Sequence, residues 1–411
     1  MQALAETTGG NAADIPLDQL DVSEVQLYAQ DSWRTPFARL RREAPVHFLS
    51  ESPHGPFWSV TTHELITYVE SHPEIFSSDF KYGGISIVDL YMQNFLSSDR
   101  PRHTEQRKVV APAFSPSELL RMGAAIRKRT SERLDAIAIG ETFDWVDNVS
   151  VELTTQMLAI LFDFPWEDRR QLTEWSHWSR NVEAARDPEM SKVRDAHMHA
   201  MTTYFNGVWA EKKNQAPGTD LISRMAHSEA MGDLTWEEKL GNLALLIVGG
   251  NDTTRNSMSG MILAFNQFPE QWAKLRADPS LLDNAVPEIV RWQTPVLSMR
   301  RTCVENTELG GQQIKKGQKV VMWYISGNRD ETVFEEPDRL IVDRENARQH
   351  VSFGFGIHRC LGSRLAELQI RILLEEMIRR RMVVELASEP VRPATLAGHG
   401  FETMPVRIRI D

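Results

Sequence analysis

A glycine-punctuated stretch near the C-terminus places one cysteine where it could bind a metal. Three glycines surround Cys360 between Ser352 and Gly362, and apolar residues recur at helical spacing directly after it. A thiol in the first turn of a helix faces unpaired N–H groups and the positive end of the helix dipole, and both favour its thiolate. Glycines also let the backbone pass close to a flat, bulky group. The pattern therefore predicts that Cys360 is a single axial ligand for haem iron.

Two other interpretations of this stretch stay open. A buried cysteine with a purely structural role would leave the flanking glycines unexplained. His358 and Cys360 could form a thiol nucleophile pair, although such partners usually come from distant parts of the chain. The stretch is not a phosphate-binding loop, because Arg359 stands where a dinucleotide motif would have its third glycine.

A second stretch combines a long apolar helix pattern with a polar centre. The helix begins with a capping box, Thr235-Trp-Glu-Glu238, and its apolar residues stop before Pro269. Its centre reads Gly249-Gly-Asn-Asp-Thr-Thr254. Glycines inside a helix cost about 1 kcal/mol each relative to alanine, and buried polar groups need partners or water. The pattern indicates a kink or local widening with a functional reason, and a merely tolerated defect is the alternative.

The cysteine stretch, written Phe353-x-Gly-x-x-His358-x-Cys360-x-Gly362, resembles the haem-binding signature of the cytochrome P-450 monooxygenases. The resemblance implies a mainly α-helical fold with small β-sheets, in which haem lies between the long threonine-containing helix and the helix after the cysteine. It also implies that Cys360 binds the iron of haem b and that Phe353, His358 and Gly362 contact the cofactor. Molecular oxygen would be the co-substrate.

The same resemblance gives the centre of the long helix a role. Asp252 and Thr253 match the family's acid–alcohol pair, in which the hydroxyl helps to deliver protons during oxygen activation. Gly249 would leave room for oxygen and substrate above haem. A peroxide-driven haem enzyme would typically lack this pair, and a non-catalytic haem-thiolate sensor would have no use for it. The pair therefore favours a monooxygenase over both alternatives.

Cationic residues elsewhere in the chain match haem-binding positions. His103 and Arg107 lie one helical turn apart, which by spacing alone indicates a solvated helix face. The resemblance implies that they approach the haem propionates, as does Arg301, and charged donors suit carboxylates. The sequence Asp99-Arg100-Pro101 departs from the family's common Asp-Pro-Pro, which puts the local loop geometry in doubt.

A further charged pair has a structural role in the resembling family. Glu288 and Arg291 are three residues apart on a predicted helix, where an ordinary surface pair would contribute a few tenths of a kcal/mol. They match the family's Glu-x-x-Arg motif, which binds the irregular segment before the cysteine stretch.

Strings between the motifs, such as Val321-Met-Trp-Tyr324, look like those of bacterial alkane and fatty-acid terminal hydroxylases. Hydroxylation of monoterpenes is the alternative, because related terpene hydroxylases share several of these strings. An apolar pocket with few polar anchors suits hydrocarbon chains. The residues expected to face the substrate are Ile85, Ile87, Leu90, Leu96, Leu246, Val296, Leu297, Met299, Phe401 and Met404.

Composition narrows the partners and the location. The chain shows no flavin or iron–sulfur motif, so we expect electrons from NAD(P)H to arrive through a separate reductase and a ferredoxin. A net charge of −11 with both signs interspersed argues against nucleic-acid binding, and two cysteines exclude a disulfide scaffold. Residues 1–30 contain no apolar run, so neither a signal peptide nor a membrane anchor is expected. We therefore expect a soluble, cytoplasmic protein.

Helical patterns dominate the elements that must position these residues. No linker or repeat divides the chain, so we expect a disordered lead-in over residues 1–15 and a single domain over 16–411. Helices are predicted over 36–43, 118–139, 151–162, 166–185, 190–214 and 220–230, a hairpin over 46–49 and 57–60, and a strand-rich patch over 300–323.

Overall fold

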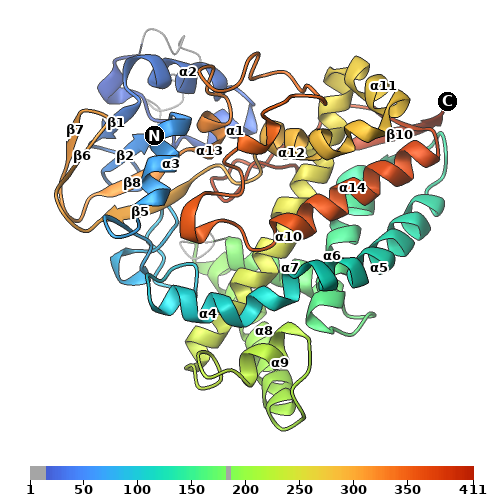
Figure 1. The fold of residues 1–411 in the computed structure, drawn as a ribbon, viewed down its shortest axis with the longest axis horizontal. Coiled ribbons are helices and arrows are strands. Elements are labelled where there is room, and N and C mark those ends of the chain that lie inside the picture. Colours follow the sequence, from blue (N-terminus) through green and yellow to red (C-terminus); the bar gives the residue numbers. More distant parts are fainter. Residues whose placement is uncertain (1–14, 182–186) are drawn as a thin grey trace.

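Helices make up most of the molecule, and the strands gather mainly at one side, on the left in Figure 1. The computed structural model describes residues 15–181 and 187–411. Within them, the predicted mainly α fold with small β-sheets is confirmed. Residues 1–14 of the lead-in predicted over 1–15 lie outside the described residues. Residues 182–185 of the helix predicted over 166–185 also lie outside them.

The largest sheet has the strand order β1-β2-β8-β5-β3. The predicted hairpin is confirmed, since Val46 of β1 pairs with Val60 of β2 in antiparallel register. The patch predicted over 300–323 contains β5 to β8. The strands of this sheet are β1 (Val46–Leu49), β2 (Phe57–Val60), β3 (Phe76–Ser77), β5 (Met299–Cys303) and β8 (Lys319–Met322). The smaller sheets contain β4 (Thr142–Asp144), β9 (Met382–Leu386) and β10 (Pro405–Ile410), and β6 (Thr307–Leu309) with β7 (Gln312–Ile314).

The helices surround α10, which crosses the middle of the molecule, and α14 packs against both α10 and α5 (Figure 1). In the first half of the chain they are α1 (Val25–Ala29), α2 (Arg34–Glu43), α3 (His63–Ser71), α4 (Arg102–Val110), α5 (Pro116–Asp135), α6 (Glu152–Phe162), α7 (Arg170–Arg180) and α8 (Pro188–Lys213). In the second half they are α9 (Leu221–Ala226), α10 (Trp236–Gln267), α11 (Pro269–Ala277), α12 (Leu282–Gln293), α13 (Tyr324–Gly327) and α14 (Ser363–Arg379).

Three helix boundaries differ from the prediction by four residues, and one of them is the end of α9, at Ala226 rather than at residue 230. Helix α5 ends at Asp135 rather than at residue 139, and Gly140, with a φ of +83°, lies in the turn that leads to β4. Helix α7 begins at Arg170 rather than at residue 166, and Trp166 lies in the preceding turn with the guanidinium of Arg129 3.9 Å from its ring centre.

The long helix α10 has the predicted start. The Thr235 hydroxyl accepts a hydrogen bond from the Glu238 N–H at 3.3 Å, and the Glu238 carboxylate accepts one from the Thr235 N–H at 2.8 Å. The α-helix continues from Trp236 to Gln267, so residues 249–254 do not break it, and the kink or local widening stays a prediction. The polar centre instead interrupts the apolar packing. One apolar cluster reaches α10 up to Ile247, and another begins at Met258.

Candidate functional site

The cysteine stretch forms a tight loop against α3. The Cys360 N–H donates to the Phe353 carbonyl at 2.7 Å, which closes the loop. Gly354 and Gly356 take φ values of +67° and +63°, a conformation that side chains with a Cβ rarely adopt. A Cβ at Gly356 would lie 2.3 Å from the Glu70 carbonyl oxygen. These glycines therefore serve the turn and its contact with α3.

Cys360 lies three residues before α14, which begins at Ser363, and so is not in the first helical turn as predicted. Burial raises the pKa of the Cys360 thiol, and the N–H groups of Gly362 and Ser363 and the charge of Arg107 only partly offset this. Without a metal the thiolate is therefore not favoured, contrary to the expectation. Cys360 is nevertheless exposed to solvent as a residue. Such a thiol can lose its proton to a metal ion.

His103 and His358 meet, although 255 positions separate them in the sequence. Their ring centres are 4.2 Å apart, both residues are buried, and none of the four ring nitrogens has a hydrogen-bond partner among the described residues. Burial, and then the charges of Arg107, Arg100 and Arg301, together lower the pKa of His103 to about 4. The same causes lower the pKa of His358. Near neutral pH both rings are therefore uncharged, and each has one unpaired N–H close to Arg107 and Arg301. These donors fit an anionic group such as a carboxylate.

Arg301 has a buried partner that the sequence analysis did not identify. Glu70 of α3 lies 3.3 Å from Arg301, and the Tyr324 hydroxyl and the Phe355 N–H both donate to its carboxylate. Burial raises the pKa of Glu70, while Arg301 opposes this shift. Glu70 therefore connects the predicted propionate-binding arginine with the cysteine loop. The sequence could have indicated that Glu70 is buried, because it lies four residues after Ile66 and so on the same apolar face of the helix.

The centre of α10 presents an open surface. Gly249 is exposed in the middle of an otherwise largely buried helix, and a Cβ built on it would have no atom within 4 Å. The Thr253 hydroxyl donates to the Gly249 carbonyl at 3.1 Å. These two predicted residues therefore lie together, and the space beside Gly249 can accommodate another group.

Asp252, next to Thr253, is buried in a set of ion pairs. Its two carboxylate oxygens each lie 2.8 Å from a guanidinium, one from Arg180 at the end of α7 and the other from Arg255. The Ser176 hydroxyl also donates to Asp252 at 2.9 Å. Spacing within the helix points to Arg255, whereas Arg180 and Ser176 lie more than 70 positions away and carry no local signal.

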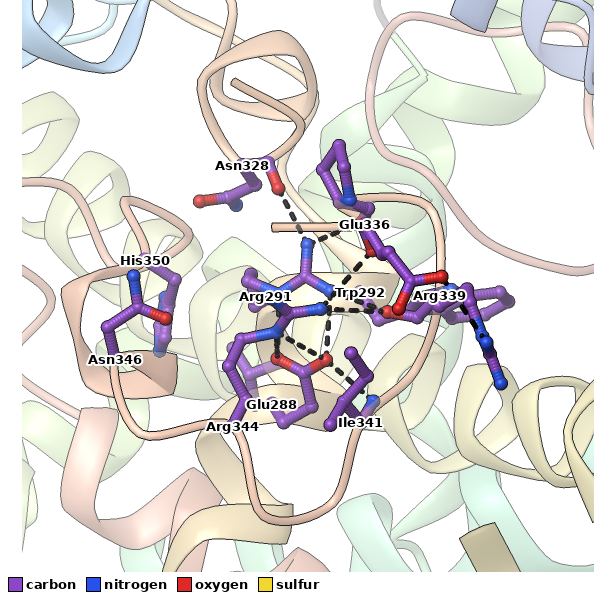
Figure 2. A network of polar contacts seen from close by, with 12 residues as sticks. Glu288, Arg291, Trp292, Asn328, Glu336, Arg339, Ile341, Arg344, Asn346 and His350 are labelled. Atoms are coloured by element: carbon purple, nitrogen blue, oxygen red, sulfur yellow. Dashed lines mark hydrogen bonds and ion pairs between the residues drawn. The ribbon is translucent and has the colours of Figure 1, made fainter. Parts of the chain in front are cut away.

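Glu288 and Arg291 form a fully buried network rather than a surface pair (Figure 2). Two hydrogen bonds of 2.7 and 2.9 Å join them, and Arg344 lies 3.1 Å from the Glu288 carboxylate. Arg291 also donates to the carbonyls of Asn328 and Pro337, at 2.8 and 2.7 Å. The network thus binds the irregular segment before the cysteine loop, as the resemblance implies, and Arg344 is the member that spacing did not reveal.

The residues expected to face the substrate differ in burial. None of them is freely exposed, and their role stays a prediction. Five lie within the apolar clusters: Ile87, Leu246, Leu297, Phe401 and Met404. Five are partly exposed and therefore able to contact another molecule: Ile85, Leu90, Leu96, Val296 and Met299.

No group of three or more His, Cys, Asp or Glu side chains in residues 15–181 and 187–411 could hold a metal ion. No helix in the same ranges is long and apolar enough to cross a membrane.

Comparison with known proteins gives concordant results. Residues 128–408 match the family model described as cytochrome P-450. The chain is 40% identical to linalool 8-monooxygenase of Pseudomonas putida, over 92% of this chain and 95% of that protein. It is 32% identical to a methyl-branched lipid omega-hydroxylase of Mycobacterium tuberculosis, over 95% and 96%. Among solved structures, CYP153D17 from a Sphingomonas species superposes with a TM-score of 0.91 at 53% identity, covering 96% of this chain and 100% of that one.

Proposed function

The chain belongs to the cytochrome P-450 family and is a monooxygenase, and we propose that it hydroxylates the terminal carbon of medium-chain alkanes or fatty acids. The observation that carries the site assignment is the set of unpaired ring nitrogens of His103 and His358. His103 lies in α4, and His358 lies in the loop that also presents Cys360. Buried ring nitrogens without partners are destabilising unless a polar group binds them, and the neighbouring Arg107 and Arg301 favour an anionic one. The haem of this family has both the iron and the carboxylates that such a site requires.

The residues that would hold haem follow from these donors. Cys360 would hold the iron through its sulfur, and His103, Arg107, Arg301 and His358 would face the propionates. Haem bound there would supply the oxygen activation that inserts one atom of O2 into a C–H bond. Contacts of haem with Phe353, Gly249 and Gly362 remain predictions from the resemblance.

Asp252 and Thr253 are the groups that we propose to move protons. The Thr253 oxygen lies on the exposed side of α10, where it can receive a proton and donate its own. The Asp252 carboxylate faces Arg180 and Arg255, so it has to turn away from at least one of them to reach the Thr253 hydroxyl. Proton delivery would thus depend on breaking an ion pair between α7 and α10.

The substrate class is supported by two observations. The partly exposed residues among those expected at the substrate are all apolar, which suits a hydrocarbon chain. A relative that is 32% identical is named an omega-hydroxylase of methyl-branched lipids, which places oxygen insertion at the end of a chain in that protein. We propose the same position of attack here.

Monoterpenes are the second candidate, because the relative at 40% identity is named linalool 8-monooxygenase. The deciding experiment is a spectral titration of the haem-loaded protein with alkanes, fatty acids and monoterpenes. Tight conversion from low spin to high spin by alkanes or fatty acids, with a terminal alcohol as product, would support the proposal. Conversion by monoterpenes alone would overturn it in favour of the second candidate.

We propose a ferredoxin and its NAD(P)H-dependent reductase as the source of electrons. Product formation with these proteins and O2 would support this, whereas product formation only with added peroxide would favour the peroxide-driven alternative. Haem binding with no turnover under either condition would favour the sensor. The cytoplasmic location stays a prediction from the sequence.

A further inference from the structure

The loop over residues 83–92 carries Ile85, Ile87 and Leu90 but contains no helix or strand. Its shape depends on contacts with other elements. The Leu90 N–H donates to the Gly83 carbonyl at 3.0 Å, and the Ile85 carbonyl accepts a hydrogen bond of 2.8 Å from the Arg300 N–H of β5. Three of the side chains expected at the substrate are therefore held by a loop that closes on itself and is attached to β5.

Asp89 attaches the loop a second time, through two cations. Its carboxylate forms an ion pair with Arg300 of β5 and lies 3.3 Å from the Lys319 ammonium of β8. Lys319 also donates to the Ile87 carbonyl at 3.4 Å and to the His54 carbonyl at 2.9 Å. One carboxylate thus joins the loop to two neighbouring strands of the large sheet.

The cation of this pair is buried, whereas the carboxylate is partly exposed. The Arg300 side chain is 3% exposed and also donates to the Tyr82 carbonyl and to the Thr302 hydroxyl. The Asp89 side chain is 45% exposed, so water can solvate it if the pair separates. If the ion pair separates, Arg300 loses a partner in a buried environment, whereas Asp89 becomes solvated. The pair should therefore separate by movement of the 83–92 loop rather than of Arg300.

The position of Arg300 keeps this contact apart from the haem residues. Side chains alternate between the two faces of a strand, so Arg300 points away from the face that Met299 and Arg301 share. Arg301 accordingly contacts Glu70, whereas Arg300 contacts the loop. The ion pairs of Asp89 therefore involve none of the residues expected to hold haem.

Gly83 shows how closely the pair is packed. A Cβ at this position would lie 2.5 Å from the Asp89 carboxylate and 2.7 Å from the Arg300 guanidinium, and the φ of Gly83 is +97°. The backbone of the loop thus passes directly beside the ion pair. The loop cannot shift without changing the distance between the two charges.

We propose that Asp89 is a positioning residue that latches the 83–92 loop and thereby sets which chain lengths the site accepts. This inference rests on the proposed function, since it takes Ile85, Ile87 and Leu90 to face the substrate. Without the ion pair of Asp89, the loop opens more often, and Ile85, Ile87 and Leu90 are positioned less firmly. A long substrate chain then binds with less extra affinity relative to a short one. The chemical step should be little affected, because the haem residues are not moved.

The first test measures the loop itself and needs no substrate. In the haem-loaded protein, Asp89→Asn should raise the hydrogen–deuterium exchange rate of peptides covering residues 83–92 several-fold. Lys319→Met removes one of the two cations and should give a smaller increase. Lys81→Met removes a cation near the same loop that pairs with Asp79 instead, and should give none. Unchanged exchange in Asp89→Asn would overturn the latch, whatever the enzyme's substrate.

The second test measures selectivity. Dissociation constants for a short and a long alkane, or for a short and a long fatty acid, are obtained from the spin-state titration. Asp89→Asn should reduce the ratio between them several-fold, with kcat at saturation changed less than twofold, and Asp89→Glu should partly restore the ratio. Faster exchange with an unchanged ratio would overturn the role in selectivity. If none of these compounds shifts the spin state of the unaltered protein, the proposed function fails, and the exchange data still decide the latch.

Discussion

Arg180 places its Nε 2.8 Å from the carboxylate of Asp252, although the two residues belong to different helices. Arg180 is the last residue of α7, and Asp252 lies in the middle of α10. Arg255 neutralises the other carboxylate oxygen at the same distance. Asp252, the acid that we propose for proton delivery, is therefore held between two cations. Its carboxylate can rotate only if it leaves one of them, and the position of Arg180 is set by the end of α7.

Thr253→Ala tests the proposed proton delivery. The variant should still bind haem and substrate but should form less product per NAD(P)H consumed and more peroxide, because the hydroxyl on the exposed side of α10 is lost. Asp252→Asn should slow turnover, since an amide cannot relay a proton. Thr254→Val is the matched control, because Thr254 is buried one residue further on and has no proposed role. Full rate and coupling in both test variants would make the α10 centre purely structural.

Substituting the two cysteines separately tests the iron ligand. The reduced carbon-monoxide complex of the unaltered protein should show the red-shifted Soret band of thiolate ligation, and Cys360→Ser should abolish it. Cys303→Ser should leave the band intact, because Cys303 is buried in β5, where its thiol donates to the Glu305 carbonyl at 2.8 Å. A normal band in Cys360→Ser would refute the assignment of the ligand.

Glu288→Gln should destabilise the fold strongly. The substitution leaves the guanidinium groups of Arg291 and Arg344 buried without their counter-charge, and breaking a buried pair in this way costs about 3–5 kcal/mol. The free energy of unfolding from urea titration measures this. Arg409→Gln is the control, because the pair of Arg409 with Glu385 is about half exposed and should contribute less than about 1 kcal/mol. Equal effects of the two substitutions would contradict the structural role of the network.

Sequence patterns predicted the contacts between residues that lie a few positions apart in the chain. The capping box from Thr235 to Glu238 and the pair of Glu288 with Arg291 both join residues three positions apart, so helix geometry alone predicts their contacts. The glycines around Cys360 are informative for a similar reason, because a left-handed turn needs them locally. The resemblance added His103 and His358, whose meeting no spacing rule predicts.

The residues that were missed act through contacts between distant segments. Glu70 binds the N–H of Phe355, and Arg180 binds Asp252, so neither contact has a fixed sequence separation that a pattern could reveal. The pKa of Cys360 was predicted in the wrong direction for the same reason. The N–H groups that favour the thiolate are local and visible in the sequence, whereas the burial that outweighs them is a property of the whole fold.

His399 should make the stability of the fold sensitive to acid. Burial lowers the pKa of His399 to about 3, its Nδ1–H donates to the Gln293 carbonyl at 2.6 Å, and its Nε2 accepts from Arg392 at 3.1 Å. In the unfolded chain the pKa returns to about 6.5. The unfolded state therefore binds the proton first, so this stabilisation is complete above about pH 6.5 and is lost as the pH falls toward 3.

The measurement is the free energy of unfolding at a series of pH values for the unaltered protein and for His399→Gln. Glutamine can still donate and accept hydrogen bonds but does not titrate in this range. The curve of the variant should fall less steeply between about pH 6.5 and 3, which isolates His399 from the carboxylates that titrate in both proteins. Parallel curves would show that His399 does not contribute to the acid sensitivity.

Some cations around the cysteine loop form ion pairs with acidic residues, and others do not. We expect the cations without an ion pair to contribute most to ferredoxin binding. Arg371 of α14 pairs with Asp283 and Glu375, so its charge is compensated. Arg364 of α14 and Lys108 of α4 are exposed, and no ion pair joins either to an acid within the described part of the chain. These two remain able to attract an acidic partner, although the net charge of the whole chain is −11.

Charge reversal at Arg364 and Lys108 tests whether ferredoxin binds at the surface that these two residues share. Arg364→Glu and Lys108→Glu should each lower the rate of electron transfer from an acidic ferredoxin several-fold at low ionic strength, and the difference from the unaltered protein should shrink as salt screens the charges. Arg371→Gln should change the rate much less, because that cation is already neutralised. Stopped-flow reduction across a salt series measures the rates. Substrate affinity should stay constant in all three variants, so a loss of affinity would indicate misfolding, and rates indifferent to both salt and charge reversal would exclude this face.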